Sequence, residues 1–295
     1  MATLRELKGR IGSVKSSEKI TGAMKMISSA KMHKAEGALR RLVPYRNQIQ
    51  SVIGHLLCSD VEFKSPLVEE REVKTIAFAV FGSDDGLCGA YNMQIFKNML
   101  EEIAAMRKTY GEDVKIKLFP IGKKIVKAVR KMGDPYLEIV KDSNITSRGT
   151  LEDVKAFNVR MQDEFVNGTV DKVVVLYTHF KSVSKQYPVT ETLLPVSPES
   201  LSEEGAEVDT NKPYLFEPGP NQIFNTVLPL YILAVLKQVF GENLASEQAA
   251  RIMAMQSAND NAKKLLEELQ LVYNKLRQQS ITTELLDILG GQKRD

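Results

Sequence analysis

The feature that most constrains the fold is the length of the two proline-free ends. Residues 1–43 and 230–295 contain no proline. A helix from about Leu4 to Arg41 would be roughly 57 Å long, and one from about Leu230 to Leu289 roughly 90 Å. A middle domain of ~150 residues has a radius of gyration of only about 15 Å, so the two helices must project from it. We therefore predict a shaft, formed by the paired ends, attached to a globular head.

Apolar residues recur along both ends at the spacing of paired helices. In the first end the stripe consists of Leu4, Leu7, Ile11 and Val14, and it resumes at Ile20, Met24 and Ile27. In the last end a heptad spacing includes Ile252, Met255, Ala262, Leu266, Leu269, Tyr273 and Leu276. Asn259, Ser280 and Thr283 occupy seam positions where Leu or Ile is usual. Such an irregular seam favours antiparallel pairing of the two ends over a self-sufficient parallel coiled coil.

The middle of the chain alternates strand-like and helix-like segments. Strands are predicted at residues 75–81, 114–121 and 173–177, helices at 92–110 and 122–132 with one more before the third strand, and an edge strand at 186–196. This order predicts an α/β head with an open, mainly parallel, Rossmann-like sheet covered by helices. The resulting domains are an N-terminal shaft helix (1–60), the head (72–198), an acidic loop (199–220) and a C-terminal shaft helix (221–295).

Charge is distributed unevenly along the chain. Residues 1–46 carry eleven Lys and Arg against three Glu, whereas residues 190–217 carry seven acids against Lys212 alone. A basic amphipathic helix is typical of proteins that bind nucleic acid or an anionic membrane surface. However, no aromatic residue precedes Tyr45, which weakens both interpretations because stacking platforms and headgroup anchors are aromatic. A merely solvated helix face is an equally good interpretation of this charge pattern.

Composition limits the protein class further. The longest apolar stretch, residues 227–236, is interrupted by Pro229 and is shorter than the ~20 apolar residues that span a bilayer. No secretory signal is evident at the N-terminus. Cys58 and Cys88 provide neither a disulfide framework nor the spacing of a metal site. We therefore expect a folded protein of the reducing cytoplasm, without a metal or cofactor.

The best candidate for an active site is the glycine-rich turn at residues 82–89. It follows the first strand and precedes a helix, where ligands often bind in such folds. However, it matches neither the dinucleotide fingerprint nor a nucleophile elbow. Cys88 would need a base, and sequence does not place His33, His55 or His179 beside it. We therefore interpret this segment as a structural turn, in which Asp84 and Asp85 act as caps, and a thiol enzyme built on Cys88 has little support.

Several motifs, taken together, resemble one known family. They are residues 20–32 (ITGAMKMISSAKM), 253–255 (MAM), 260–262 (DNA), 269–275 (LQLVYNK), 277–278 (RQ), 280–285 (SITTEL) and the turn 83–92 (SDDGLCGAYN). In this order they closely resemble the gamma subunit of F-type ATP synthase, and the resemblance extends over essentially the whole chain. Two residues depart from the family pattern: Gly22 stands where Lys is usual, and Asp85 stands where Arg is usual.

The resemblance implies a rotor that is not itself an enzyme. In this family the paired terminal helices form an asymmetric shaft inside a ring of three alpha and three beta subunits. The head contacts the epsilon subunit and the c-ring of the membrane sector. Proton flow turns the c-ring and shaft together, which couples ion transport to ATP synthesis in the ring. This implies a peripheral protein at the cytoplasmic face of the bacterial inner membrane, with no nucleic-acid partner.

The resemblance also implies which residues contact the ring. Met24 matches the family position beside an acidic loop of beta, and Lys25 belongs to the neighbouring basic face. The remaining contact residues implied for the last helix are Arg251, Arg277, Gln278, Thr282 and Glu284. From the pattern alone, Met24 would be a packing residue, and Thr282 and Glu284 ordinary surface residues.

The alternative is an α/β ligand-binding or regulatory protein whose basic helical arm docks nucleic acid or membrane. This alternative predicts a self-contained fold with salt-dependent binding. The rotor interpretation instead predicts an apolar C-terminal tip that is exposed without partners. The tip residues are Leu285, Leu286, Ile288 and Leu289.

Overall fold

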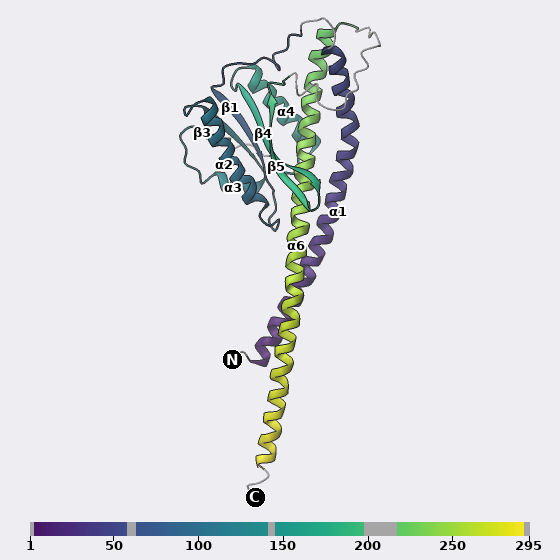
Figure 1. The fold of residues 1–295 in the computed structure, drawn as a ribbon, viewed down its shortest axis with the longest axis vertical. Coiled ribbons are helices and arrows are strands. Elements are labelled where there is room, and N and C mark those ends of the chain that lie inside the picture. The colour runs from purple at the N-terminus through teal and green to yellow at the C-terminus, as the bar shows by residue number, and fades with distance from the viewer. Residues whose placement is uncertain (1–2, 58–62, 141–144, 198–216, 292–295) are drawn as a thin grey trace.

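The chain forms a head mounted on the side of a long two-helix shaft (Figure 1). The structure is a computed structural model, and it describes residues 3–57, 63–140, 145–197 and 217–291. The acidic loop predicted at 199–220 lies almost entirely outside the described residues. An α/β head with terminal shaft helices, as predicted from the sequence, is confirmed.

The shaft consists of α1 (Leu4–Leu57, 54 residues) and α6 (Pro220–Gly291, 72 residues). The two helices run antiparallel and lie side by side (Figure 1). Asn259 Nδ2 donates a 2.7 Å hydrogen bond to the Glu18 carbonyl oxygen, so a polar residue at the predicted seam satisfies a backbone acceptor across it. At the other end of the contact, Arg46 donates to Gln238 Oε1 at 2.7 Å. These contacts fix the antiparallel register.

Both shaft helices continue past a proline, beyond the proline-free segments used to estimate their lengths but within the shaft helices predicted at residues 1–60 and 221–295. The estimates ended the first helix at Arg41 and began the last at Leu230, beside Pro44 and Pro229. A proline inside a helix costs about 3 kcal/mol. The extra turns that it permits carry buried apolar side chains, each of which stabilises the fold by ~1.5–3 kcal/mol. These side chains are Ile49, Ile53, Leu56, Phe224 and Leu228.

The head is built on a five-stranded sheet with the order β3-β2-β1-β4-β5. Its strands are β1 (Thr75–Phe81), β2 (Lys115–Ile121), β3 (Leu137–Ile139), β4 (Lys172–Ser182) and β5 (Lys185–Leu194). All neighbours pair in parallel except β4 and β5, which form an antiparallel hairpin at one edge. Strand β3 was not predicted, because three residues are too short to show a period.

Helices cover both faces of the sheet, and β1 shows how the two layers divide. Ile76, Phe78 and Val80 pack with α2 (Tyr91–Tyr110) and α3 (Lys123–Val129). The alternate residues, Ala77, Ala79 and Phe81, pack with α4 (Leu151–Val166). They also pack with the C-terminal part of α1 and the N-terminal part of α6. The shaft helices therefore form one of the two layers of the head.

Helix α6 alone, in the described chain, is long and apolar enough by length and composition to cross a membrane. Its apolar residues include Phe224, Leu228, Ile232, Leu236 and Phe240, all of which belong to the core that covers the sheet. Packing against the sheet thus accounts for the hydropathy of this segment.

An ion pair between α2 and the segment before β3 should make the head sensitive to acid. Arg107 Nη2 donates to Asp134 Oδ2 at 2.7 Å, which lowers the pKa of Asp134 below its usual range. The folded state therefore binds this proton less readily than the unfolded state, so the stabilisation is present above the ordinary Asp pKa and lost as pH falls. Asp134→Asn should cost up to about 1 kcal/mol at neutral pH, since the pair reaches solvent. Urea unfolding of both proteins at pH 7 and at low pH would test this; a difference that grows on acidification would contradict it.

Candidate functional site on the shaft

The residues predicted to contact partners lie along the shaft at three levels. Met24 and Lys25 are half-buried on α1, roughly level with Gln256 of α6. Arg251 is buried on α6, where the shaft leaves the head. An exposed group occupies the last turns of α6 and consists of Arg277, Gln278, Thr282 and Glu284. The structure therefore does not gather these residues into one site but spreads them along the shaft.

At the first level, Lys25 is tied to the opposite helix. Its ammonium donates a hydrogen bond to Gln256 Oε1, and Gln256 Nε2 donates to Asp260 Oδ2 at 2.7 Å. The exposed apolar side chains at this level are those of neighbouring residues, with Met26 69% and Ile27 55% exposed. Met26 and Ile27 thus offer more contact surface than Met24, a distinction that the sequence motif did not reveal.

At the last level, α6 extends past the N-terminal end of α1 (Figure 1). Extrapolated from the Glu18–Asn259 contact, Leu4 lies level with about residue 273 of α6. Arg277 and Glu284 form no ion pair with any residue that the structure describes. Thr282 Oγ1 bonds the Gln278 carbonyl at 2.9 Å, within the helix itself. The side chains of Arg277 and Glu284 are therefore free to engage a partner.

The tip of α6 is an apolar single helix without a neighbour among the described residues. Its side chains are 45–64% exposed and lie at Ile281, Leu285, Leu286, Ile288 and Leu289. The prediction of an exposed apolar tip is confirmed. Contiguous apolar surface of this kind marks an interaction site.

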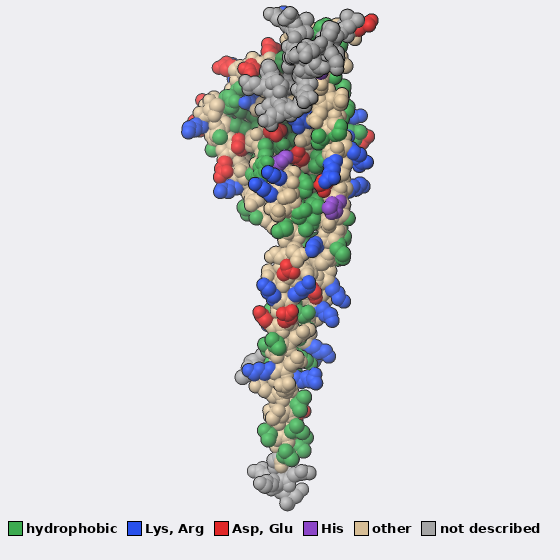
Figure 2. Space-filling view, turned by 45° about the vertical axis from the view of Figure 1, so that its right-hand side comes forward, with side chains coloured by type: hydrophobic (Ala, Val, Ile, Leu, Met, Phe, Trp, Pro, Cys, Tyr) green, Lys and Arg blue, Asp and Glu red, His purple; other side chains and the backbone are tan. Residues whose placement is uncertain are grey.

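Lysine and arginine side chains stand out along the shaft (Figure 2). Those that α1 exposes are Arg5, Lys8, Arg10, Lys15, Lys19, Lys31, Lys34, Arg40 and Arg41. Of these, Arg40 pairs with Glu36 one turn earlier, at 2.7 Å. The basic end predicted from the sequence thus forms an exposed basic face on α1, which suits an acidic partner surface.

Arg251 differs from the other predicted contact residues because its donors are used inside the chain. Its Nε donates to the Gly86 carbonyl at 3.1 Å, and its Nη2 donates to the Asp85 carbonyl at 3.2 Å and to Glu247 Oε1 at 2.8 Å. The side chain is only 5% exposed. Sequence could not show this orientation, because a shaft residue level with the head can face either the head or solvent.

Glu247, the partner of Arg251, is also enclosed. Burial raises the pKa of Glu247 above its usual range, against the opposing effect of the Arg251 guanidinium. Its Oε2 accepts a 3.2 Å hydrogen bond from Ser147 Oγ. Each carboxylate oxygen thus has a donor, as a buried acid requires.

The glycine-rich turn at residues 82–89 contacts α6, whose side chains occupy the crevice where a ligand would bind in other folds of this class. Strand order reverses between β1 and β4, where open α/β folds bind ligands beyond the ends of the strands. Here Asn243 Nδ2 of α6 donates to the Gly82 carbonyl at 3.1 Å, and Ser246 Oγ donates to the Thr178 carbonyl of β4 at 2.9 Å. Tyr91 OH in turn donates to Asn243 Oδ1 at 2.7 Å. Because α6 fills the crevice, the favoured interpretation of this turn as structural agrees with its geometry.

Cys88 and the two acids of the turn have structural contacts as well. Cys88 is buried and its Sγ lies 3.2 Å from Asn92 Nδ2; among the described residues none of its hydrogen bonds is to a histidine. Asp84 Oδ1 accepts a hydrogen bond from the Lys123 N–H at 3.1 Å, at the first residue of α3, whose N-cap residue is Gly122. Asp85 forms an ion pair with Arg148, which joins this turn to the loop before α4.

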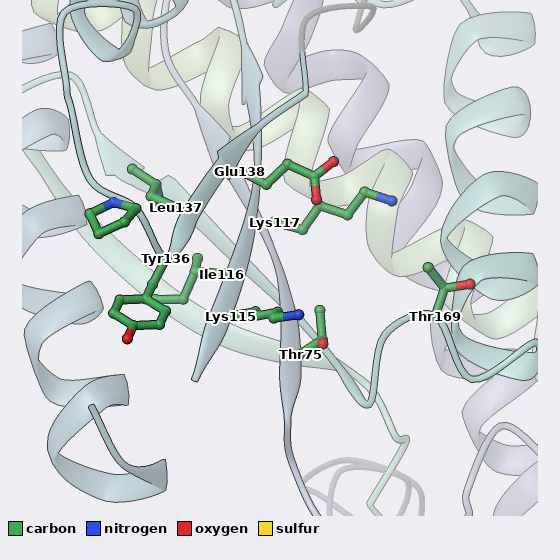
Figure 3. Close-up of a pocket in the computed structure, with 9 residues that line it drawn as sticks. Thr75, Lys115, Ile116, Lys117, Tyr136, Leu137, Glu138 and Thr169 are labelled. Atoms are coloured by element: carbon green, nitrogen blue, oxygen red, sulfur yellow. The ribbon is translucent and has the colours of Figure 1, made fainter. Parts of the chain in front are cut away.

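A pocket lies at the other end of the sheet, where β1, β2 and β3 begin (Figure 3). It encloses about 650 Å³ and is lined by Thr75, Lys115, Ile116, Lys117, Pro135, Tyr136, Leu137, Glu138 and Thr169. Lys117 is neutralised by Glu164 at 2.8 Å. Within the described ranges, no group of three or more His, Cys, Asp or Glu residues could hold a metal ion. The lining therefore combines both charges without a recognisable catalytic arrangement.

Comparison with known proteins gives matches along the full chain. The family described as ATP synthase (ATP-synt) matches residues 3–293. The ATP synthase gamma chain of Bacteroides thetaiotaomicron is 38% identical over 301 residues, covering 99% of this chain and 99% of that relative. The ATP synthase gamma chain of Parabacteroides distasonis is 40% identical over 293 residues, covering 99% of this chain and 98% of that relative.

Solved structures share the fold. A chain from the Euglena gracilis mitochondrial ATP synthase (OSCP/F1/c-ring) has a TM-score of 0.61 at 21% identity, covering 98% of this chain and 93% of that one. A chain from the Tetrahymena thermophila mitochondrial ATP synthase central stalk and c-ring has a TM-score of 0.55 at 20% identity, covering 81% and 99%. The full-length sequence matches do not favour a ligand-binding or regulatory protein with a basic arm. The chain belongs to the ATP synthase gamma chain family.

Proposed function

We propose that this chain is the rotor of the central stalk of an ATP synthase, coupling ion flow through the membrane sector to ATP synthesis in the catalytic ring. The observation that carries the proposal is that α6 extends beyond the N-terminal end of α1 and exposes an apolar tip. A soluble chain gains nothing from such a tip alone, whereas a ring of subunits closed around it would bury it.

The two parts of the chain would face different partners. The shaft, residues 1–60 and 221–295, would stand inside a ring of three alpha and three beta subunits. The head, residues 72–198, would contact the epsilon subunit and the c-ring, and the acidic loop 199–220 would join it to the shaft. The gamma chains of Bacteroides thetaiotaomicron and Parabacteroides distasonis are bacterial, and in a bacterium this arrangement would place the protein at the cytoplasmic face of the inner membrane, as a peripheral subunit.

The chain itself would carry no catalytic or cofactor site. In support, the crevice in which α/β folds bind ligands holds Asn243 and Ser246 of α6. Catalysis would then belong to the ring. The shaft would influence it by contacting each beta subunit differently, since a rotor shifts an equilibrium only through differential contact.

The contact surface that we propose includes residues exposed or half-exposed on the shaft. They are Met24, Lys25, Arg277, Gln278, Thr282 and Glu284. Arg277 can form bidentate contacts with carboxylates, while the amide of Gln278 offers uncharged contacts that break readily as the rotor turns. For Arg251, burial supports a role inside the chain.

Reconstitution tests the proposal. The chain is mixed with separately purified alpha and beta subunits, any complex is isolated by size, and its ATP hydrolysis is compared with that of alpha and beta alone. We expect one copy of the chain for three of each partner, with hydrolysis that depends on the chain. If folded alpha and beta subunits form no complex with it, the rotor proposal is wrong.

A charge variant sharpens this test. Arg277→Glu should weaken the complex or its hydrolysis, because the residue is exposed without an ion-pair partner in the described chain. Lys8→Glu, on an exposed turn of α1, serves as the matched control for a change of two charge units. Equal effects of both variants would indicate a general electrostatic attraction instead of a specific contact at Arg277.

A further inference from the structure

A buried polar network joins the head to the shaft. Arg251 and Glu247 of α6 form its centre, with the Arg251 donors directed at the Asp85 and Gly86 carbonyls and at Glu247. Guanidinium hydrogen bonds to these acceptors have a fixed planar geometry, so they define direction as well as distance. The network therefore specifies how α6 is rotated relative to the turn at residues 82–89.

The same network continues into two other segments of the head. Ser147 Oγ lies 3.2 Å from Glu247 Oε2 and 3.0 Å from Asp84 Oδ2, so its one proton is shared between these two acceptors, and the Ser147 N–H also donates to Asp84 Oδ2 at 3.0 Å. The other oxygen of Asp84 accepts from Lys123 N at the start of α3. One connected set thus links α6, the turn, the loop before α4, and α3. We call Asp84, Ser147, Glu247 and Arg251 the polar joint.

The polar joint lies where the shaft leaves the head. On the N-terminal side, the buried apolar side chains of α6 between Phe224 and Phe240 belong to the core of the head. At the level of the joint, Ile252 packs with Met32 of α1 and with the β4–β5 hairpin at Phe180 and Val183. From Gln256 onward, the hydrogen bonds of the described α6 side chains are to α1 or to α6 itself. The joint is thus the last polar attachment before the free shaft.

We propose that the polar joint fixes the angular position of the shaft relative to the head, and that Arg251 is a positioning residue for torque transfer instead of a contact to the ring. This inference rests on the proposed rotor function. Apolar packing of α6 on the sheet resists separation but is not directional. The directional bonds of Arg251 resist twisting at the point where torque passes from one part to the other.

The variant that opens the joint is Glu247→Gln combined with Arg251→Met. Replacing a buried ion pair by neutral groups of similar volume is tolerated, whereas removing one partner leaves a buried charge unpaired. The double variant therefore keeps the fold but leaves the Asp85 and Gly86 carbonyls without their Arg251 donors. In a reconstituted synthase in vesicles we expect near-normal ATP hydrolysis but a severalfold loss of ions pumped per ATP hydrolysed.

A reversible disulfide between the turn and α6 distinguishes a role of Arg251 in positioning the shaft from a contact of Arg251 with the ring. A Cβ added at Gly89 would lie 3.6 Å from Ala254 Cβ across the joint, within the range of about 3.5–4.5 Å found in disulfides. Gly89→Cys with Ala254→Cys, in a background with Cys58→Ser and Cys88→Ser, would form a disulfide when diamide oxidises the two thiols. Dithiothreitol would reduce it again.

This cysteine pair is placed in the double variant and pumping is measured in both redox states. We expect oxidation to restore the ions pumped per ATP and reduction to abolish the rescue. The same cysteine pair with Glu247 and Arg251 intact is the control, and it should pump in both states. This control also covers the strain of Cys at position 89, where φ is +60°.

Two results would overturn the inference while leaving the rotor proposal intact. One is normal pumping by the double variant. The other is a loss of hydrolysis together with pumping that the disulfide does not restore, because Arg251 would then act by touching the ring. Failure of the unaltered chain to assemble with alpha and beta would instead refute the rotor proposal itself.

Discussion

A chain truncated after Leu276 is expected to bind the ring of alpha and beta subunits at least about tenfold more weakly than the full chain, with its own fold intact. The truncation removes the exposed group at the end of α6 and the apolar tip beyond it. Leu285, Leu286, Ile288 and Leu289 are each more than half exposed in the free chain. A ring that encloses the tip would bury these side chains.

The size of the effect follows from the buried area. Fully burying a Leu or Ile side chain contributes ~1.5–3 kcal/mol, so four of them contribute roughly 6 kcal/mol or more before other terms. Ordering of the partner loops and imperfect fit cancel much of this gain. A net loss of only ~1.4 kcal/mol already corresponds to a tenfold weaker complex.

The truncation should leave the free energy of unfolding of the chain almost unchanged. The removed residues that the structure describes lie beyond the end of α1, and their side chains are exposed except for that of Ser280, which is half-buried. Surface changes of this kind alter the free energy of unfolding by no more than about 0.5 kcal/mol. Urea unfolding measures the stability, and titration of fluorescently labelled chain with the preassembled ring measures the affinity.

A full-length control distinguishes the effect of the apolar surface of the tip from the effect of the length of α6. Substituting Gln at positions 285, 286, 288 and 289 keeps the helix, because Gln has a good helix propensity, but removes the apolar surface. If the tip acts through burial, this variant should bind as weakly as the truncated chain. Wild-type affinity of the Gln variant would show that the length of the helix matters and its apolar surface does not.

Local patterns sufficed to predict the shaft but did not explain why its helices continue past two prolines. The proline-free ends and their apolar stripes indicated two long helices in antiparallel contact, as found. The predicted bounds, 1–60 and 221–295, already included Pro44 and Pro229, but the local pattern gave no reason for a helix to continue there, because the cost of a proline is local whereas the compensating burial of Ile53 or Leu228 depends on the sheet. Sequence windows do not contain that tertiary contact.

The role of the head likewise required the structure. The glycine-rich turn after β1 has the position of a ligand site, and only the path of α6 shows that Asn243 and Ser246 occupy it. The orientation of Arg251 was hidden for the same reason, since its acceptors, the Asp85 and Gly86 carbonyls, lie far away in sequence. By contrast, the exposed residues at the end of α6 needed no tertiary information.

Gly122, at the junction of β2 and α3, is where we expect the most damaging small substitution in the head. Its backbone has φ 99° and ψ 135°, a conformation that L side chains rarely adopt. A Cβ there would lie 3.0 Å from the Gly82 carbonyl carbon and from the Ser83 carbonyl group. These are backbone atoms of the turn that carries the polar joint, so they cannot move aside without disturbing it.

Gly122→Ala should therefore destabilise the chain by roughly 3–5 kcal/mol, as the sum of ~1–3 kcal/mol of backbone strain and a similar cost of overpacking. Gly111→Ala is the matched control, because Gly111 has φ 106° and ψ 154° but open space around the added carbon. That variant should show the strain alone, ~1–3 kcal/mol. Urea unfolding of both variants measures the difference. Equal destabilisation would mean that the turn yields to the added methyl group, and that the contact between α3 and the turn is softer than its geometry indicates.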